Sequence, residues 1–143
     1  MIAIGCDHGG YDLKQKVIAH LQERGLACKD FGCPDKNSCD YPVYGAAVAN
    51  AVASGECDRG IVICTTGIGI SITANKVKGI RCALCGDPVS ARLTREHNDA
   101  NVLAMGAAII GERVALNIVD IFMDTPFSGE EKHQRRVNQI ESC

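Results

Sequence analysis

The chain contains the stretch Arg59-Gly60-Ile61-Val62-Ile63-Cys64-Thr65-Thr66-Gly67-Ile68-Gly69-Ile70-Ser71. Its β-branched run 61–63 predicts a fully buried strand. The strand ends on a thiol and two hydroxyls, and glycines follow at once, so we expect a helix over 67–78. A strand that turns through glycine into a helix gathers free backbone N–H groups and the positive end of a helix dipole at one point. Such a point can hold a phosphate or a developing oxyanion, and its field favours the thiolate form of Cys64.

The composition indicates one globular domain over residues 1–143. Hydrophobic residues make up 46% and charged residues 22% of the chain, values typical of a folded domain. The net charge of -2 gives no reason to expect a nucleic acid or an anionic membrane as a partner. We find neither a membrane-length apolar run nor the zones of a signal peptide, so we expect a cytoplasmic protein.

The nine cysteines raise the question of a metal or disulfide framework. Cys82 and Cys85 match a C-x-x-C pattern, but residues three apart in a strand point to opposite faces. No second pair or nearby histidine completes a zinc set. We therefore predict no metal and no cofactor, and we expect Cys33, Cys39 and Cys143 to be the thiols most prone to oxidation.

Strand-like and helix-like segments alternate along the whole chain. We predict strands at 2–6, 27–31, 61–63, 80–84 and 102–105, and helices at 11–23, 40–53, 67–78, 87–96, 112–123 and about 128–141. This alternation predicts an α/β fold: a Rossmann-like, three-layer α/β/α domain with a five-stranded parallel sheet. The last helix carries Lys132 and Arg136 and is expected to contribute to a phosphate site.

In such a sheet the ligand binds beyond the carboxyl ends of the strands. Asp7 and His8 follow the first strand and the segment 64–71 follows the third, so both are expected at this edge. His97 and Asn98 stand in a predicted polar loop, 97–101, before the fifth strand. They are therefore expected at the amino edge, where they would serve the pocket of a neighbouring subunit.

Each of these motifs also has a purely structural interpretation. Gly67 and Gly69 would let a helix pack close to a sheet, Asp7 would cap a helix, and His97 would be a solvated surface histidine. The first turn lacks the G-x-G-x-x-G spacing, and no lysine follows the glycines after Cys64, so a small phosphorylated ligand is favoured over ATP or NAD. Lys132 and Arg136 would ordinarily form a solvated helix face, but their spacing of four also lets them bracket a phosphate.

Taken together, six segments resemble the ribose-5-phosphate isomerase B family, which also holds allose-6-phosphate and galactose-6-phosphate isomerases. The segments are Gly5-Cys6-Asp7-His8-Gly9-Gly10, Asp40-Tyr41-Pro42, 64–71, Ala74-Asn75-Lys76, Arg95-Glu96-His97-Asn98-Asp99 and Lys132-His133-Gln134-Arg135-Arg136-Val137. The resemblance implies a homodimer, sometimes a tetramer, that acts on a small sugar phosphate, with each active site built from two subunits. Only this resemblance implies that the last helix contributes to the dimer.

The resemblance also implies roles for individual residues. Cys64 is the expected base, which moves a proton between C2 and C1 through an enediolate. His97, helped by Thr66 and Asp7, is expected to open the furanose ring. The phosphate is expected to bind His8, Lys132 and Arg136, and the sugar is expected to contact Tyr41 and Asn98. The developing oxyanion is expected to be held by the backbone amides of Gly67, Ile68, Gly69 and Ser71.

The chain departs from the family pattern at two places that bear on the substrate. Lys132 stands where an arginine is usual, and Ala107-Ala108 stand where many relatives carry an arginine. The resemblance implies D-ribose 5-phosphate and D-ribulose 5-phosphate as the substrate pair. The loss of a large side chain would admit a six-carbon sugar phosphate, so allose 6-phosphate or galactose 6-phosphate is the alternative. A non-catalytic module that only binds a sugar phosphate is the alternative from another class.

Overall fold

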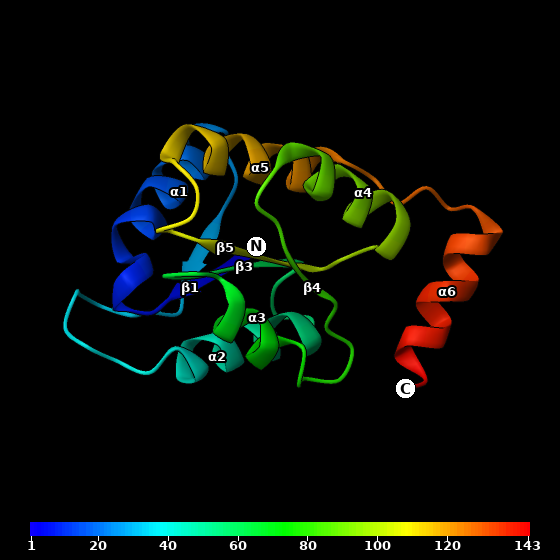
Figure 1. The fold of residues 1–143 in the computed structure, drawn as a ribbon, viewed down its shortest axis with the longest axis horizontal. Helices are drawn as coiled ribbons and strands as arrows, with labels where there is room; N and C mark the ends of the chain where they lie inside the picture. The colour runs from blue at the N-terminus through cyan, green and yellow to red at the C-terminus, as the bar shows by residue number, and fades with distance from the viewer.

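The computed structural model describes residues 1–143 and confirms the predicted five-stranded parallel sheet (Figure 1). The strands are β1 (Ile2–Cys6), β2 (Cys28–Asp30), β3 (Arg59–Cys64), β4 (Cys82–Leu84) and β5 (Val102–Gly106). The helices are α1 (Tyr11–Glu23), α2 (Tyr41–Ala53), α3 (Ile68–Ala74), α4 (Pro88–Asn98), α5 (Glu112–Asp124) and α6 (Glu131–Glu141), and a 3₁₀ turn, η1 (His8–Gly10), precedes α1. The strand order is β2-β1-β3-β5-β4, and every neighbouring pair is parallel.

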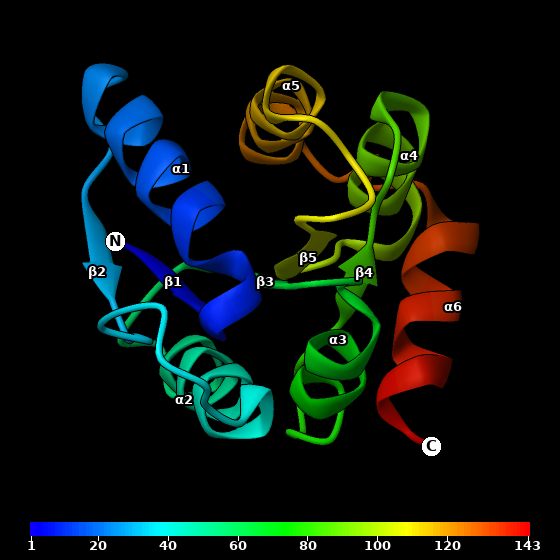
Figure 2. The ribbon, with the colours of Figure 1, turned by 60° about the vertical axis from the view of Figure 1, so that its left-hand side comes forward.

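The helices cover both faces of the sheet and give the predicted three layers. Helices α1, α4 and α5 lie on one face and α2 and α3 on the other (Figure 2). Val17 and Phe122 are fully buried in the core under the first face, and Val48 and Ile70 in the core under the second. Each such side chain contributes about 1.5–3 kcal/mol through burial, so the two apolar faces of the sheet explain why helices cover both.

The strand order places a switch point between the neighbouring strands β1 and β3. The chain leaves β1 through α1 on one face and leaves β3 through α3 on the other face. Crevices for ligands form at such switch points, outside the carboxyl ends of the strands. Cys6 pairs with Ile63 in the register, and the Asp7 N–H donates to the Ile63 carbonyl at 3.2 Å. The Asp7 turn and the Cys64 turn therefore lie side by side.

The structure differs from the predicted boundaries around α3 and α4. Helix α3 ends at Ala74, not residue 78, because the Asn75 side chain accepts from the Cys82 N–H at 2.8 Å and donates to the Cys82 carbonyl at 2.9 Å. Strand β4 accordingly starts at residue 82 rather than 80. Helix α4 continues through His97 and Asn98, which we predicted in a loop, and ends only where Asp99 adopts a left-handed conformation with φ 46°.

The cysteines follow the predicted pattern in part. Cys85 belongs to the core on the α1 side of the sheet, whereas Cys82 packs against the opposite core, as expected for residues three apart. Cys33, which we expected among the accessible thiols, is buried, and its sulfur lies 3.8 Å from that of Cys6. None of the helices has both the length and the apolar character that are needed to span a membrane.

Candidate active site

Cys64 ends β3 and opens the turn that leads into α3. The Gly67 N–H donates to the Cys64 sulfur at 3.1 Å, in a backbone conformation with φ +78°. A Cβ atom on Gly67 would lie 2.5 Å from the Leu84 side chain and 2.7 Å from the Met105 carbonyl carbon. Only glycine therefore fits, and the close packing against β5 is what directs the amide at the sulfur. Cys64 itself is 4% exposed.

The amides predicted to hold an oxyanion belong to the first turn of α3. The Ile68 N–H donates to Oγ1 of Thr66 at 3.2 Å, and the Ser71 N–H donates to the Gly67 carbonyl at 3.2 Å. The Ser71 hydroxyl donates to the Ile68 carbonyl at 2.7 Å, so Ser71 uses both of its donors inside the helix. Of the four predicted amides, three already have acceptors in the turn or the helix, and only the Gly69 N–H, on a half-buried residue before the first helical acceptor, is left available to a ligand.

Tyr41 and the turn after β1 pack against this thiol turn. A Cβ on Gly69 would come within 2.6 Å of the Tyr41 ring, so the tyrosine lies directly over the start of α3. A Cβ on Gly9 would lie 2.3 Å from the hydroxyl oxygen of Thr65, so this position also has no room for a side chain. Oδ1 of Asp7, which is buried, accepts from the N–H groups of Gly9 and Gly10 at 2.9 and 3.2 Å. Asp7 therefore does cap η1, which was its structural interpretation.

His8 is exposed at the same edge of the sheet. Its Nδ1 atom accepts a hydrogen bond from the Cys39 N–H at 3.2 Å. An Nδ1 atom that accepts leaves the hydrogen of the neutral ring on Nε2, so His8 can donate from that atom. Ala107 and Ala108, which directly follow β5, lie next to the thiol turn. Their N–H groups donate to the carbonyls of Cys64 and Thr65, each at 2.9 Å.

A second group of predicted residues lies on α4 and α6. The ring of His97 stacks against that of His133 with centroids 4.4 Å apart and an interplanar angle of 35°. His133 is buried, and its Nδ1 atom lies 2.6 Å from the Ser128 hydroxyl. Sequence reasoning missed His133. The available signal was its spacing of four residues from Val137, the other buried residue of α6.

The two cations predicted to bind phosphate are exposed on α6. The Lys132 ammonium lies 3.7 Å from the Glu130 carboxylate, and Arg136 forms no ion pair within the chain. Asn98, at the end of α4, is also exposed. These three side chains and His97 therefore form a polar, positively charged group around the junction of α4 and α6.

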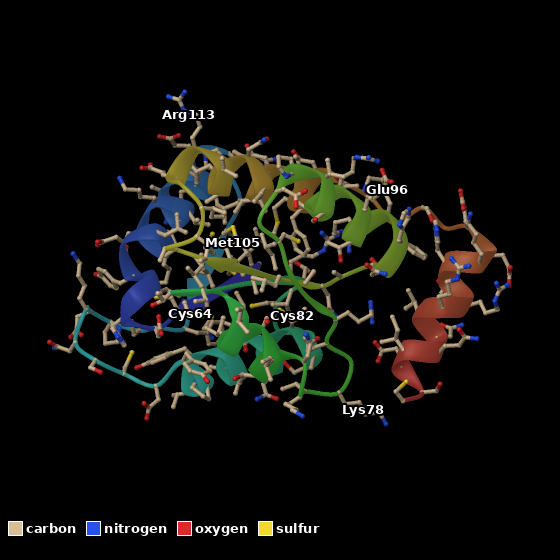
Figure 3. The ribbon with its side chains drawn as sticks, in the orientation of Figure 1. Cys64, Lys78, Cys82, Glu96, Met105 and Arg113 are labelled. Atoms are coloured by element: carbon tan, nitrogen blue, oxygen red, sulfur yellow. The ribbon has the colours of Figure 1, made fainter.

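Within one chain these two groups are far apart. Strands β3 and β5 are parallel, with Gly60 opposite Val102 and Cys64 opposite Gly106. Four residues of strand span about 13 Å, so Val102, just after the end of α4, lies about that far from Cys64 along the sheet. Figure 3 shows the separation directly between Cys64 and Glu96, the residue before His97. The structure thus brings the first set together at the carboxyl edge and the second set at the amino edge. This agrees with the prediction for the turns after β1 and β3 and for His97 and Asn98; no edge was predicted for Tyr41, Lys132 and Arg136.

An apolar cavity of about 300 Å³ lies beside the thiol turn. Its lining includes Thr66, Ile68, Leu84 and Ile109. Three of these side chains are unusually exposed for apolar residues: Ile68 by 52%, Leu84 by 43% and Ile109 by 65%. An exposed apolar surface of this kind, next to a group of polar side chains, is typical of a contact surface.

Comparison with known proteins gives a consistent result. The model of the ribose/galactose isomerase family matches residues 2–140. Ribose-5-phosphate isomerase B of Escherichia coli is 50% identical over 139 residues, which cover 97% of this chain and 93% of that protein. Galactose-6-phosphate isomerase subunit LacB of Clostridium acetobutylicum is 42% identical over 141 residues, which cover 99% of this chain and 82% of that protein.

Solved structures agree with the sequences. The structure of ribose-5-phosphate isomerase B from Clostridium thermocellum has a TM-score of 0.97 and 53% identity, and the match covers 99% of this chain and 95% of that one. The type B ribose 5-phosphate isomerase of Trypanosoma brucei has a TM-score of 0.96 and 42% identity over 99% of this chain and 96% of that one. The fold, the order of the motifs and these matches agree, and the chain belongs to the ribose/galactose isomerase family.

Proposed function

We propose that the protein interconverts D-ribose 5-phosphate and D-ribulose 5-phosphate. The observation that carries the proposal is the thiol turn, in which the Gly67 N–H contacts the Cys64 sulfur and the Gly69 N–H is left free by the start of a helix. This arrangement offers a base and an oxyanion donor side by side, which is what proton transfer next to a carbonyl requires. We infer the substrate from the similarity to relatives that are named ribose-5-phosphate isomerase B.

The chemical step is a proton transfer by the sulfur. The Cys64 thiolate takes the proton from C2 of the open-chain aldose, and the electrons of the C–H bond form the C1–C2 double bond of an enediolate. The Gly69 N–H holds the oxygen that gains charge. The proton of the O2 hydroxyl then moves to O1, and the sulfur returns the carbon proton to C1, which leaves a carbonyl at C2 and a hydroxyl at C1. Cys64 is buried whereas Thr65 and Thr66 are exposed, so the sugar approaches from the threonine side and water has little access to the thiolate.

Ring opening and phosphate binding need the second group of residues. His97 acts as the acid and base that opens the furanose, and Lys132 and Arg136 bracket the phosphate together with His8. Since α4 ends beside the start of β5, about 13 Å along the sheet from Cys64, a second copy completes each site. The exposed apolar side chains beside the thiol turn support a homodimer in which each protomer faces the other's α4 and α6.

A six-carbon sugar 6-phosphate is the second candidate substrate. The small side chains of Ala107 and Ala108 beside the thiol turn leave space where a larger residue would fill it. The 42% identity to a galactose-6-phosphate isomerase subunit points the same way. Turnover of ribose 5-phosphate, allose 6-phosphate and galactose 6-phosphate, measured side by side on one preparation, separates the two candidates by their kcat/KM ratios.

The proposal is tested with Cys64→Ala in deuterated water. The wild-type protein should exchange the C1 or C2 proton of the sugar phosphate while it interconverts the isomers. Cys64→Ala should lower kcat by about 10²–10⁴-fold and leave competition by inorganic phosphate unchanged. Cys57→Ala, which removes another buried thiol, serves as the matched control. A Cys64→Ala variant with a tenth of the wild-type rate would exclude the thiol as the base, and binding without exchange by the wild type would favour the non-catalytic module.

A further inference from the structure

Helix α6 stands apart from the layers of the fold and is attached at two places (Figure 1). Near its start, the Ser128 N–H donates to the Glu96 carbonyl at 3.1 Å, and His133 stacks on His97. Beyond Val137 the helix is exposed, and Ile140 is 47% accessible. A cavity of about 330 Å³ lies between this last turn and the residues of β4 and α4 behind it. The final turn of α6 therefore gains little from apolar packing.

One side chain joins that turn to the rest of the chain. Nη1 of Arg81 donates to the Glu141 carboxylate at 2.6 Å, and no other hydrogen bond or ion pair links the last turn of α6 to another element. Arg81 precedes β4, and its backbone N–H donates to Oδ1 of Asn101 at 2.8 Å. The guanidinium is only 16% exposed, so solvent screens its ion pairs less than it screens a surface pair.

The remaining donors of Arg81 hold the end of α4. Nε donates to the Asn98 carbonyl at 2.9 Å, and Nη2 donates to the Asp99 carbonyl at 2.8 Å. Carbonyls in the last turn of a helix lack backbone partners and carry the negative end of the helix dipole, so a guanidinium suits them well. A lysine could not make these three contacts at once, because its ammonium is a single point charge.

We propose that Arg81 is a positioning residue that fixes α6 against the end of α4. It thereby presents the ring-opening residue His97, the sugar-binding residue Asn98 and the two phosphate-binding cations of α6 as one rigid unit to the site of the other protomer. The inference rests on the proposed function, because it assigns Arg81 an effect on how that site binds phosphate. Loss of the contact leaves α6 attached near its start and free to tilt at its end, which displaces Arg136.

The experiment compares Arg81→Met, Arg81→Lys and Glu141→Gln with Arg92→Met. Arg92 also forms an ion pair, with Glu96 on α4, but on an exposed surface, so it controls for the loss of a charge. In Arg81→Met, the KM for ribose 5-phosphate and the inhibition constant of inorganic phosphate should both rise about tenfold, with kcat within about threefold. Glu141→Gln should raise both constants by a smaller factor. Arg81→Lys should give values between those of the wild type and Arg81→Met, and Arg92→Met should match the wild type in both constants.

Hydrogen exchange of the backbone amides supplies a readout that does not depend on turnover. In Arg81→Met and Glu141→Gln, the amides of residues 131–141 should exchange faster while those of β3 keep their wild-type rates. Unchanged exchange in α6 together with an unchanged phosphate constant in Glu141→Gln would overturn the proposal, even if Arg81→Met failed to fold. Absence of turnover in the wild type would instead refute the proposed function, and the exchange rates would still decide the role of Arg81.

Discussion

Mixing two inactive variants tests whether the active site is shared between chains. Cys64→Ala removes the base and His97→Ala removes the ring-opening group. The register of β3 and β5 places Cys64 and the end of α4 at opposite edges of the sheet, about 13 Å apart. Each variant alone should lose about 10²–10⁴-fold in turnover of ribose 5-phosphate. In a mixed dimer, the thiol of one chain meets the histidine of the other, so one of its two sites is intact. Random pairing makes half of the dimers mixed, and the mixture should therefore recover about a quarter of the wild-type activity.

The assay is the rate of ribulose 5-phosphate formation after the two variants are co-expressed with different affinity tags. Native mass spectrometry of the doubly purified species shows that mixed dimers are present. That species should reach about half of the wild-type rate per dimer. Each variant carrying both tags serves as the baseline. If doubly tagged dimers form but stay at the baseline, then Cys64 and His97 do not act in one intersubunit site, and the reasoning from strand register fails.

Three further predictions concern single substitutions. His97→Ala should lower kcat/KM for ribose 5-phosphate by about 10²-fold or more. The same substitution should change kcat/KM only slightly for a sugar phosphate that is too short to cyclise. Equal losses in the two assays would argue against ring opening as the role of His97. Gly67→Ala should lower the free energy of unfolding by about 2–4 kcal/mol in urea titrations, because of the positive φ and the contact with Met105; a stability equal to wild type would contradict the packing at the turn. Burial raises the pKa of the Cys85 thiol to about 11 from 9.0. The unfolded chain thus releases this proton at lower pH than the folded chain. The contribution of Cys85 to stability should therefore be complete below pH 9 and fall above it by up to about 1.4 kcal/mol per pH unit until pH 11, in addition to any fall from other buried thiols. Cys85→Ala should flatten that fall, and an unchanged slope would exclude the contribution.

The sheet and its layers were predictable from the sequence because the signals are local. The apolar runs of β1, β3 and β5 are fully buried strands, and the glycine-rich turn after Cys64 leads into a helix as expected. The opposite placement of Cys64 and His97 followed from chain order in a parallel sheet alone. These predictions depend on periodicity and topology, which a single sequence contains.

The errors arose where side chains from distant parts of the chain decide the local structure. The Asn75 side chain ends α3 by binding the Cys82 backbone, seven residues further along. The run His97-Asn98-Asp99 has the composition of a loop, yet α4 continues until Asp99 takes a left-handed conformation. Cys33 is buried because its segment folds back, with its N–H donating to the Cys6 carbonyl at 2.9 Å and its carbonyl accepting from Lys14 at 2.7 Å. No local pattern encodes these contacts.

The turn that holds Cys64 is supported mainly by main-chain atoms. Gly67 packs against the backbone of Met105 and Gly106, and Gly106 in turn packs against the carbonyl of Thr66. Such a support is insensitive to the identity of most surrounding side chains. Residues around the turn, including Ala107 and Ala108, can therefore vary in size while the sulfur and the amides keep their geometry. A family built on this turn can change the length of the sugar that it accepts without rebuilding its reactive centre.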